Sequence, residues 1–107
     1  MPEFIDAGPY LASILRKSAL DSSLGFTNSS RRHRIGRSRM LACLINSPRL
    51  FLDTSSRADG NFLMAIGLDD SGRLLEIGVI LKENEDVVII HAMVARQKWR
   101  DLLAKEV

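Results

Sequence analysis

The segment Arg31–Arg39 holds the residue types that bind and cleave phosphodiesters. It reads Arg-Arg-His-Arg-Ile-Gly-Arg-Ser-Arg, so five arginines surround one histidine. Between Ser22 and Leu52 the chain has six of its fifteen basic residues and no acidic residue, while all thirteen acidic residues lie elsewhere. Guanidinium groups bind phosphate oxygens in a two-pronged geometry, and a local positive potential steers polyanions. We therefore expect a nucleic acid as partner, contacted by Arg31, Arg34, Arg37 and Arg39.

The two histidines, His33 and His91, are the candidates for chemistry on RNA. Breaking an RNA strand needs no metal when the 2′-hydroxyl attacks the phosphate: one group takes its proton, another protonates the leaving oxygen, and cations stabilise the phosphoryl charge. Imidazole suits both proton transfers near neutral pH. His33 could instead contact phosphate only, or be a solvated histidine beside a charge run. His91 could act from the end of a strand, or be a buried histidine bonded to a backbone carbonyl.

Three further cations could complete a positive groove. Arg73 follows an Asp-Ser-Gly turn directly, and it could reach over a sheet or only decorate a hairpin. Arg96 and Lys98 open the last helix, where they would add a second positive edge or be ordinary surface residues. Trp99 shares helical spacing with two leucines, which favours a place in the core over base stacking.

The composition excludes several classes of protein. The chain has 107 residues, of which 46% are apolar and 26% charged, as in a single globular domain. No apolar run approaches the roughly 20 residues of a membrane span, and the N-terminus lacks a signal-peptide pattern, so we expect a cytoplasmic protein. The single cysteine, Cys43, falls in an apolar stripe, which predicts a buried thiol. No metal-ligand spacing or glycine-rich nucleotide loop occurs, and we expect neither metal nor cofactor.

Apolar residues at helical spacing predict three helices. The first begins at Pro9 and carries Leu11, Ile14, Leu15 and Ala19 on one face. Residues Ser22 to Ser30 collect serine, threonine and asparagine and predict a loop, which could be mobile. A second helix runs from about Gly36 to Asn46, with Arg37 and Arg39 directed away from its apolar stripe. A third spans Ala95 to Lys105 and has a basic side.

Alternating patterns between the second and third helices predict strands. A brief extended run surrounds Phe51, Phe62–Leu68 leads into a turn at Asp69–Gly72, and Leu74–Leu81 has one apolar side. Val87–Met93 is apolar except for His91, which predicts the central strand. The chain is thus expected to be a single α+β domain, 1–107, with a small antiparallel sheet of three to four strands packed with two N-terminal helices and one C-terminal helix. Residues 1–30 would form the N-terminal helix and serine-rich loop before a core of residues 31–107.

The order of these motifs resembles BrnT-type toxins, small ribonucleases of the RelE-like class. The resemblance covers roughly two thirds of the chain, from Arg31 to Leu103. The residues that carry it are Arg32-His33-Arg34-Ile35, Leu41-Ala42 with Leu44 and Ser47-Pro48, Ile66-Gly67, Ser71-Gly72-Arg73-Leu74, and Ile90-His91-Ala92 followed by Arg96 and Lys98. The chain differs from the family at Arg34, where glycine is usual, and at Met93, where a basic residue is common.

The resemblance implies an endoribonuclease that cuts mRNA without metal and is silenced by a tightly bound antitoxin, with which it would form a hetero-oligomer. His33 and Arg32 would carry over as site residues, assisted by Arg73 and the cations after the last strand. Two other functions fit the same residues. The Arg31–Arg39 segment could belong to a non-catalytic nucleic-acid-binding or regulatory module, or to an adaptor that accepts an acidic peptide.

Overall fold

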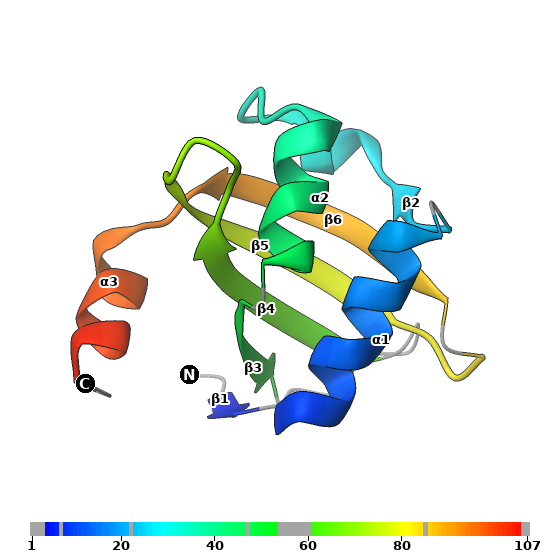
Figure 1. The fold of residues 1–107 in the computed structure, drawn as a ribbon, viewed down its shortest axis with the longest axis horizontal. Helices are drawn as coiled ribbons and strands as arrows, with labels where there is room; N and C mark the ends of the chain where they lie inside the picture. Colours follow the sequence, from blue (N-terminus) through cyan, green and yellow to red (C-terminus); the bar gives the residue numbers. More distant parts are fainter. Residues whose placement is uncertain are drawn as a thin grey trace.

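The computed structural model describes residues 4–6, 8–21, 23–46, 48–53, 61–84 and 86–105. These residues form an α+β fold in which one sheet carries helices on its two faces (Figure 1). The elements, in chain order, are β1 (Phe4–Asp6), α1 (Gly8–Leu20), β2 (Gly25–Phe26), the 3-10 helix η1 (Asn28–Arg31), α2 (Arg37–Ile45), β3 (Arg49–Asp53), β4 (Asn61–Leu68), β5 (Leu74–Leu81), β6 (Val87–Val94) and α3 (Gln97–Ala104).

The sheet has six strands in the order β1-β3-β4-β5-β6-β2, so the expected three to four strands were too few. Strands β3 to β6 form an antiparallel meander, whose edges are covered by β1, antiparallel to β3, and by β2, parallel to β6. The expectation of a purely antiparallel sheet is therefore also wrong. Strands of three and two residues are too short to show an alternating pattern, which is why the sequence did not reveal them.

The helical segments agree closely with the periodicity. α1, α2 and α3 lie where the apolar spacing predicted them, and the turns at Asp69–Gly72 and after Lys82 close the two hairpins. The N-terminal part, however, also contains β1, β2 and η1, so it is more than two helices and a loop. Within the part of the chain that the structure describes, no helix combines the length and the apolar character that crossing a bilayer requires.

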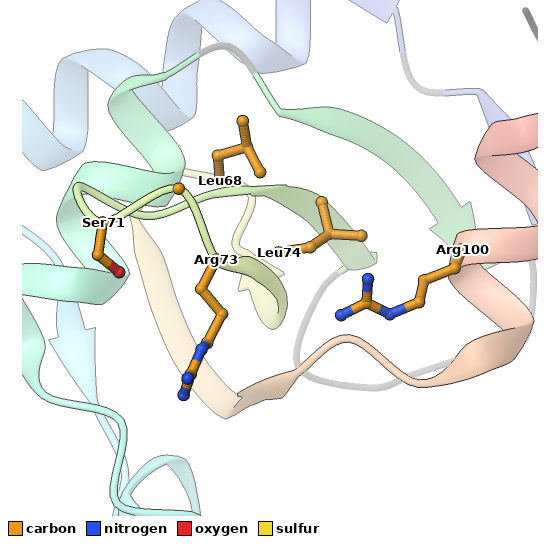
Figure 2. Close-up of a pocket in the computed structure, with 6 residues that line it drawn as sticks. Leu68, Ser71, Arg73, Leu74 and Arg100 are labelled. Atoms are coloured by element: carbon orange, nitrogen blue, oxygen red, sulfur yellow. The ribbon is translucent and has the colours of Figure 1, made fainter.

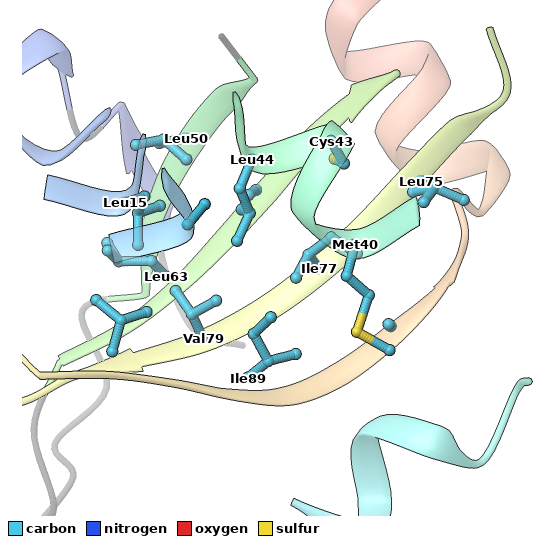
Figure 3. Close-up of a cluster of buried hydrophobic side chains, with 14 of the residues drawn as sticks. Leu15, Met40, Cys43, Leu44, Leu50, Leu63, Leu75, Ile77, Val79 and Ile89 are labelled. Carbon is cyan, nitrogen blue, oxygen red and sulfur yellow. The ribbon is translucent and has the colours of Figure 1, made fainter. Parts of the chain in front are cut away.

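Helices α1 and α2 cover one face of the sheet, which we call the helical face (Figures 1 and 3). Leu15 of α1 and Leu44 of α2 pack on alternate residues of the central strands, including Leu63 and Ile77. Cys43 is fully buried in this cluster, as the apolar stripe predicted. Burial, reinforced by the nearby Asp69 carboxylate, raises the pKa of the Cys43 thiol to about 12. This thiol is a packing group.

The opposite face is covered in part by α3, and we call it the α3 face. Trp99 is 3% exposed and packs with Phe51, Met64 and Ile66, so the prediction that it belongs to the core is confirmed. Strand β5 is buried on both faces, with Leu75 and Ile77 on the helical face and Glu76 and Ile80 on the α3 face. The expected single buried side of β5 was therefore wrong, and a glutamate lies inside the protein.

Strand β6 is not central, because only the two-residue β2 separates it from the edge; β4 and β5 occupy the middle. Its residues Val87, Ile89 and Ala92 are buried, while Val88, Ile90 and Met93 are half-buried. The apolar run in β6 thus has two parts: the residues on one face are buried under the helices, and those on the other face are only partly covered.

Candidate functional site

A bulge in β6 turns His91 towards the α3 face. Val79 pairs with Ile89 and Gly78 with His91, so Ile90 is an extra residue in the register. In a regular strand His91 would share the helical face with Ile89, because side chains alternate. The bulge lets Ala92 take that buried place and sends His91 to the other side. His91 therefore lies in mid-strand and not at the strand end that the sequence suggested.

Gly78 makes room for this arrangement. A Cβ added at Gly78 would lie 3.0 Å from Cβ of His91 and 3.2 Å from the ring of Phe62. Both contacts are tighter than side chains normally allow. Glycine at position 78 therefore leaves the space that the side chain of His91 occupies next to β5.

The buried carboxylate of Glu76 binds His91 and Arg96. Its side chain is fully buried, with Oε2 at 3.1 Å from His91 Nε2 and 2.8 Å from Arg96 Nη2. Oε1 accepts hydrogen bonds from the backbone N–H and from Nε of Arg96, each at 2.9 Å. Burial alone would raise the pKa of Glu76, but the hydrogen bonds from His91 and Arg96 outweigh it and lower the pKa to about 2. Glu76 is thus a charged carboxylate at neutral pH.

The negative charge of Glu76 determines which nitrogen of His91 carries the hydrogen. A carboxylate offers only acceptors, so His91 Nε2 carries the hydrogen and donates it to Glu76. Nδ1 remains the atom that can exchange a proton with a substrate. His91 is half-buried and bonded to a carboxylate, so the alternative of a buried histidine bonded to a backbone carbonyl is wrong. A carboxylate that orients an imidazole and stabilises its positive charge is the arrangement used in acid–base catalysis.

His33 meets His91 from the basic segment. The two imidazole rings form an edge-to-face contact, with centroids 5.8 Å apart and planes at 79°. His33 is exposed, so it can reach a ligand. We call His33, His91, Glu76 and Arg96 the histidine cluster. It joins the N-terminal basic segment to Arg96 at the start of α3.

Hydroxyl groups of the serine-rich segment fix the basic segment beside the bulge. Ser29 Oγ donates to the carbonyl of Ile90 at 2.7 Å, and Thr27 donates to the carbonyl of Ile89 through its backbone N–H and Oγ1. Ser30 is fully buried, and its Oγ bonds the carbonyl of Thr27. The predicted loop is therefore β2 and η1 bonded along β6; Ser22 lies outside the described residues.

Arg34 adopts a conformation that glycine favours. Its φ is 59°, in the left-handed region, and it is the only described residue other than glycine with positive φ. On either side of it, His33 is exposed and Ile35 is buried.

The arginines of the basic segment, namely the predicted site residue Arg32 and the predicted nucleic-acid contacts, separate into two kinds. Arg31, Arg32 and Arg34 are exposed, and Arg37 is exposed with its guanidinium 4.6 Å from the ring centroid of Phe26. Arg39 differs, because its Nε donates to the buried carboxylate of Asp69 at 2.8 Å. The structure thus gives Arg39 a structural contact, while the other four arginines face solvent.

Asp69 organises the turn that carries Arg73. Its Oδ1 accepts hydrogen bonds from the backbone N–H of Ser71 and of Arg73 and from Ser71 Oγ, at 2.8–2.9 Å. Burial would raise the pKa of Asp69, but these bonds and the one from Arg39 hold it well below its usual value. Asp69 bonds only the backbone of Arg73, and the side chain of Arg73 is exposed.

The remaining predicted cations lie at the start of α3. Arg96 is the N-cap residue of the helix, with its side chain half exposed and bonded to Glu76. Lys98 is exposed, with Nζ 5.1 Å from the ring centroid of Trp99. His33 thus contacts His91, and Glu76 bonds both His91 and Arg96, whereas no described contact links Arg73 or Lys98 to these residues.

Sequence reasoning missed Glu76, which holds the cluster together. The available signal was a lone acidic residue in the apolar run Leu74–Leu81, read as one solvent-facing position. A charge in such a run can equally mark a buried carboxylate with cationic partners. Among the described residues, no group of three or more histidines, cysteines or carboxylates is arranged to hold a metal ion.

Comparison with known proteins identifies no relative: no family model matches the chain, and no curated protein or solved structure matches it.

Proposed function

We propose that this protein is an endoribonuclease that cleaves RNA through the strand's own 2′-hydroxyl, without a metal ion. The single observation that carries the proposal is the contact between His33 and His91, one of which is bound to a buried carboxylate. Two imidazoles at this separation can serve one phosphodiester, one taking a proton while the other gives one. Exposed arginines around them supply the positive charge that a phosphoryl group requires.

The contacts of the two histidines suggest how they divide the work. His91, whose Nε2 donates to the buried carboxylate of Glu76, is assigned as the proton donor, and exposed His33, between Arg32 and Arg34 in the chain, is assigned as the base. His33 removes the proton of the 2′-hydroxyl, and the 2′-oxygen bonds to phosphorus. The bond from phosphorus to the 5′-oxygen breaks, and His91 Nδ1 protonates that oxygen. The products are a 2′,3′-cyclic phosphate and a 5′-hydroxyl.

Exposed cations of the basic segment, the β4–β5 hairpin and α3 would bind the charged substrate. Arg32 lies directly before His33, and Arg73 and Lys98 are exposed on the hairpin and on α3. Arg96 has its Nε and Nη2 bonded to Glu76, so we assign it to holding the network and giving the cluster a positive edge. In keeping with the resemblance to BrnT-type toxins, the substrate would be mRNA in the cytoplasm, and a cognate antitoxin would cover the basic surface.

Cleavage in a chelator tests the proposal. Purified protein should cut single-stranded RNA in the presence of EDTA and leave 2′,3′-cyclic phosphate ends. His33→Ala and His91→Ala should each slow cleavage about 10²- to 10⁴-fold, the usual contribution of a general acid or base. His33 is exposed, so His33→Ala should keep the wild-type melting temperature. Unchanged cleavage by the double variant, purified in the same way, would remove the histidines from the mechanism.

A non-catalytic nucleic-acid-binding module is the second candidate. It is favoured by the complete hydrogen bonding of Glu76, since the network with His91 and Arg96 could serve only to satisfy a buried charge. Such a module would bind RNA with an affinity that falls steeply with salt, while the RNA stays intact. Expression of the protein alone would then leave growth unaffected, whereas a nuclease toxin should stop growth unless its antitoxin is present.

A further inference from the structure

An open hollow lies beside the β4–β5 hairpin and is lined by two arginines from different elements. Its volume is about 550 Å³, and its lining residues are Leu68, Ser71, Gly72, Arg73, Leu74 and Arg100. Figure 2 shows the side chain of Arg100 reaching from α3 back towards the hairpin, with Leu74 between it and Arg73. Two of these residues are basic and none is acidic, so the hollow favours an anion.

Hydrogen bonds hold the residues that line the hollow in place. Buried Asp69 bonds the backbone of Ser71 and of Arg73, and Gly72 has φ of 82°, so the turn that presents Arg73 is fixed. On the other side, Arg100 Nε donates to the carbonyl of Ala95 at 3.2 Å, which orients the guanidinium along the start of α3. The backbone that carries Arg73 and the guanidinium of Arg100 are therefore positioned before a ligand arrives, which lowers the entropy cost of binding.

One peptide group connects this hollow with the histidine cluster. The carbonyl of Ala95 accepts the bond from Arg100, and the N–H of the same peptide, on Arg96, donates to Glu76 at 2.9 Å. Leu74, which lines the hollow, and Glu76 are alternate residues of β5 and lie on the same face of the sheet. Alternate residues of a strand are about 7 Å apart, a step comparable with the spacing of neighbouring phosphates along an RNA strand.

We propose that the hollow between Arg73 and Arg100 is a phosphate subsite for the phosphodiester next to the one that the histidine cluster cleaves. This inference rests on the proposed ribonuclease function and adds Arg100, which the sequence did not single out. The subsite would give longer RNA strands an affinity advantage over a dinucleotide, because only a longer strand fills both places. The hydrophobic floor at Leu68 and Leu74 would lie under the sugar between the two phosphates.

Binding to an uncleavable RNA tests the subsite separately from catalysis. The probe is a 2′-O-methyl RNA oligonucleotide of about ten nucleotides, with a 2′-O-methyl dinucleotide for comparison. Each lost contact to a phosphate of a single strand lowers the slope of log K against log salt by about 0.7. Arg100→Gln should therefore reduce the slope for the longer strand by about 0.7 and shrink its affinity advantage over the dinucleotide.

The control variant is Arg16→Gln, an exposed arginine of α1, which covers the other face of the sheet. It removes the same charge and should leave the slope for the longer strand at its wild-type value. Arg100→Lys keeps a positive charge and should keep most of the slope, which separates loss of the cation from loosening of α3. Equal slopes for Arg100→Gln and Arg16→Gln would overturn the subsite.

The outcomes also separate this inference from the proposed function. If the wild-type protein leaves cleavable RNA intact but Arg100→Gln still lowers the slope, the subsite stands as a phosphate site and only the nuclease proposal fails. If RNA is cut in the chelator assay but Arg100→Gln binds like the control, the subsite fails alone. Absence of any salt-dependent binding by the wild-type protein would overturn both.

Discussion

Glu76 and His91 are bonded across neighbouring strands, with 3.1 Å between the carboxylate Oε2 and the imidazole Nε2, although they lie 15 residues apart in the chain. The carboxylate is fully buried, whereas the imidazole is partly open to solvent and contacts His33. A buried negative charge thus supports a ring that substrate can reach.

Glu76→Gln should slow RNA cleavage about 10²-fold, because a neutral amide no longer stabilises positive charge on His91. The amide can still bond Arg96, so the protein should fold, and its circular dichroism should match the wild type. Single-turnover cleavage is the measurement, with Glu83→Gln in the exposed β5–β6 turn as control. A wild-type rate for Glu76→Gln would reduce the network to a structural role.

Gly78→Ala should destabilise the protein by about 1–3 kcal/mol, because the added methyl group overpacks against His91 and Phe62. The variant should also cleave RNA more slowly under conditions in which it is fully folded, because the added methyl group displaces His91. Gly36→Ala is the matched control, because nothing lies within 4 Å of a Cβ at that position. The measurements are the unfolding free energy in urea and the rate of RNA cleavage. Equal unfolding free energies for Gly78→Ala and Gly36→Ala would contradict the close contact of residue 78 with His91 and Phe62.

Arg39→Gln and Arg37→Gln should differ although the two arginines are neighbours in a charge run. Arg39 bonds buried Asp69, so its loss should cost about 2 kcal/mol of unfolding free energy, the value of a hydrogen bond to a charged group. Arg37 is exposed, and its replacement should change stability by less than about 0.5 kcal/mol while weakening RNA binding. The roles assigned to them would be refuted by the reverse order of melting temperatures.

Arg34→Gly should leave the protein as stable as the wild type or stabilise it by up to about 1 kcal/mol, because it relieves a left-handed residue at the cost of a more flexible unfolded chain. The same substitution at Arg16, exposed within α1, should destabilise by about 1 kcal/mol. Thermal unfolding of both variants tests this. A loss of stability at Arg34 as large as at Arg16 would contradict the assigned conformation.

Acid should destabilise the protein as Glu76 and Asp69 become protonated. Both have a pKa below the ordinary value in the folded state, with that of Glu76 at about 2 instead of 4.5. Their stabilising contribution is therefore complete above the unfolded pKa and is lost as pH falls through the folded pKa. Urea denaturation should show a falling unfolding free energy from about pH 5 towards pH 2. In Glu76→Gln this fall should be shallower than in Glu83→Gln; an identical fall would assign it to other groups.

Local patterns were sufficient for much of the fold. The helices and the strands from β3 onward follow from apolar spacing, because burying one face of each element imposes a period of 3.6 or 2 residues. The site was predicted only in part. His33 and His91 were singled out by residue type, whereas the burial of Glu76 and the bond between Arg39 and Asp69 were not foreseen. Both were missed for the same reason, since burial of a charge depends on partners distant in sequence, such as Arg96 for Glu76 and Arg39 for Asp69.

By itself the sequence determined the segregation of charge, the helical stripes and the turn chemistry at Asp69–Gly72, which depend on residues close together in the chain. Only the tertiary structure decided that His91 faces Glu76 and His33. An extra residue at Ile90 reverses the alternation of β6, and the hydroxyl of Ser29 bonds that same bulge. A bulge forms where pairing with a neighbouring strand and packing on both faces demand it, and those demands arise only when distant segments meet.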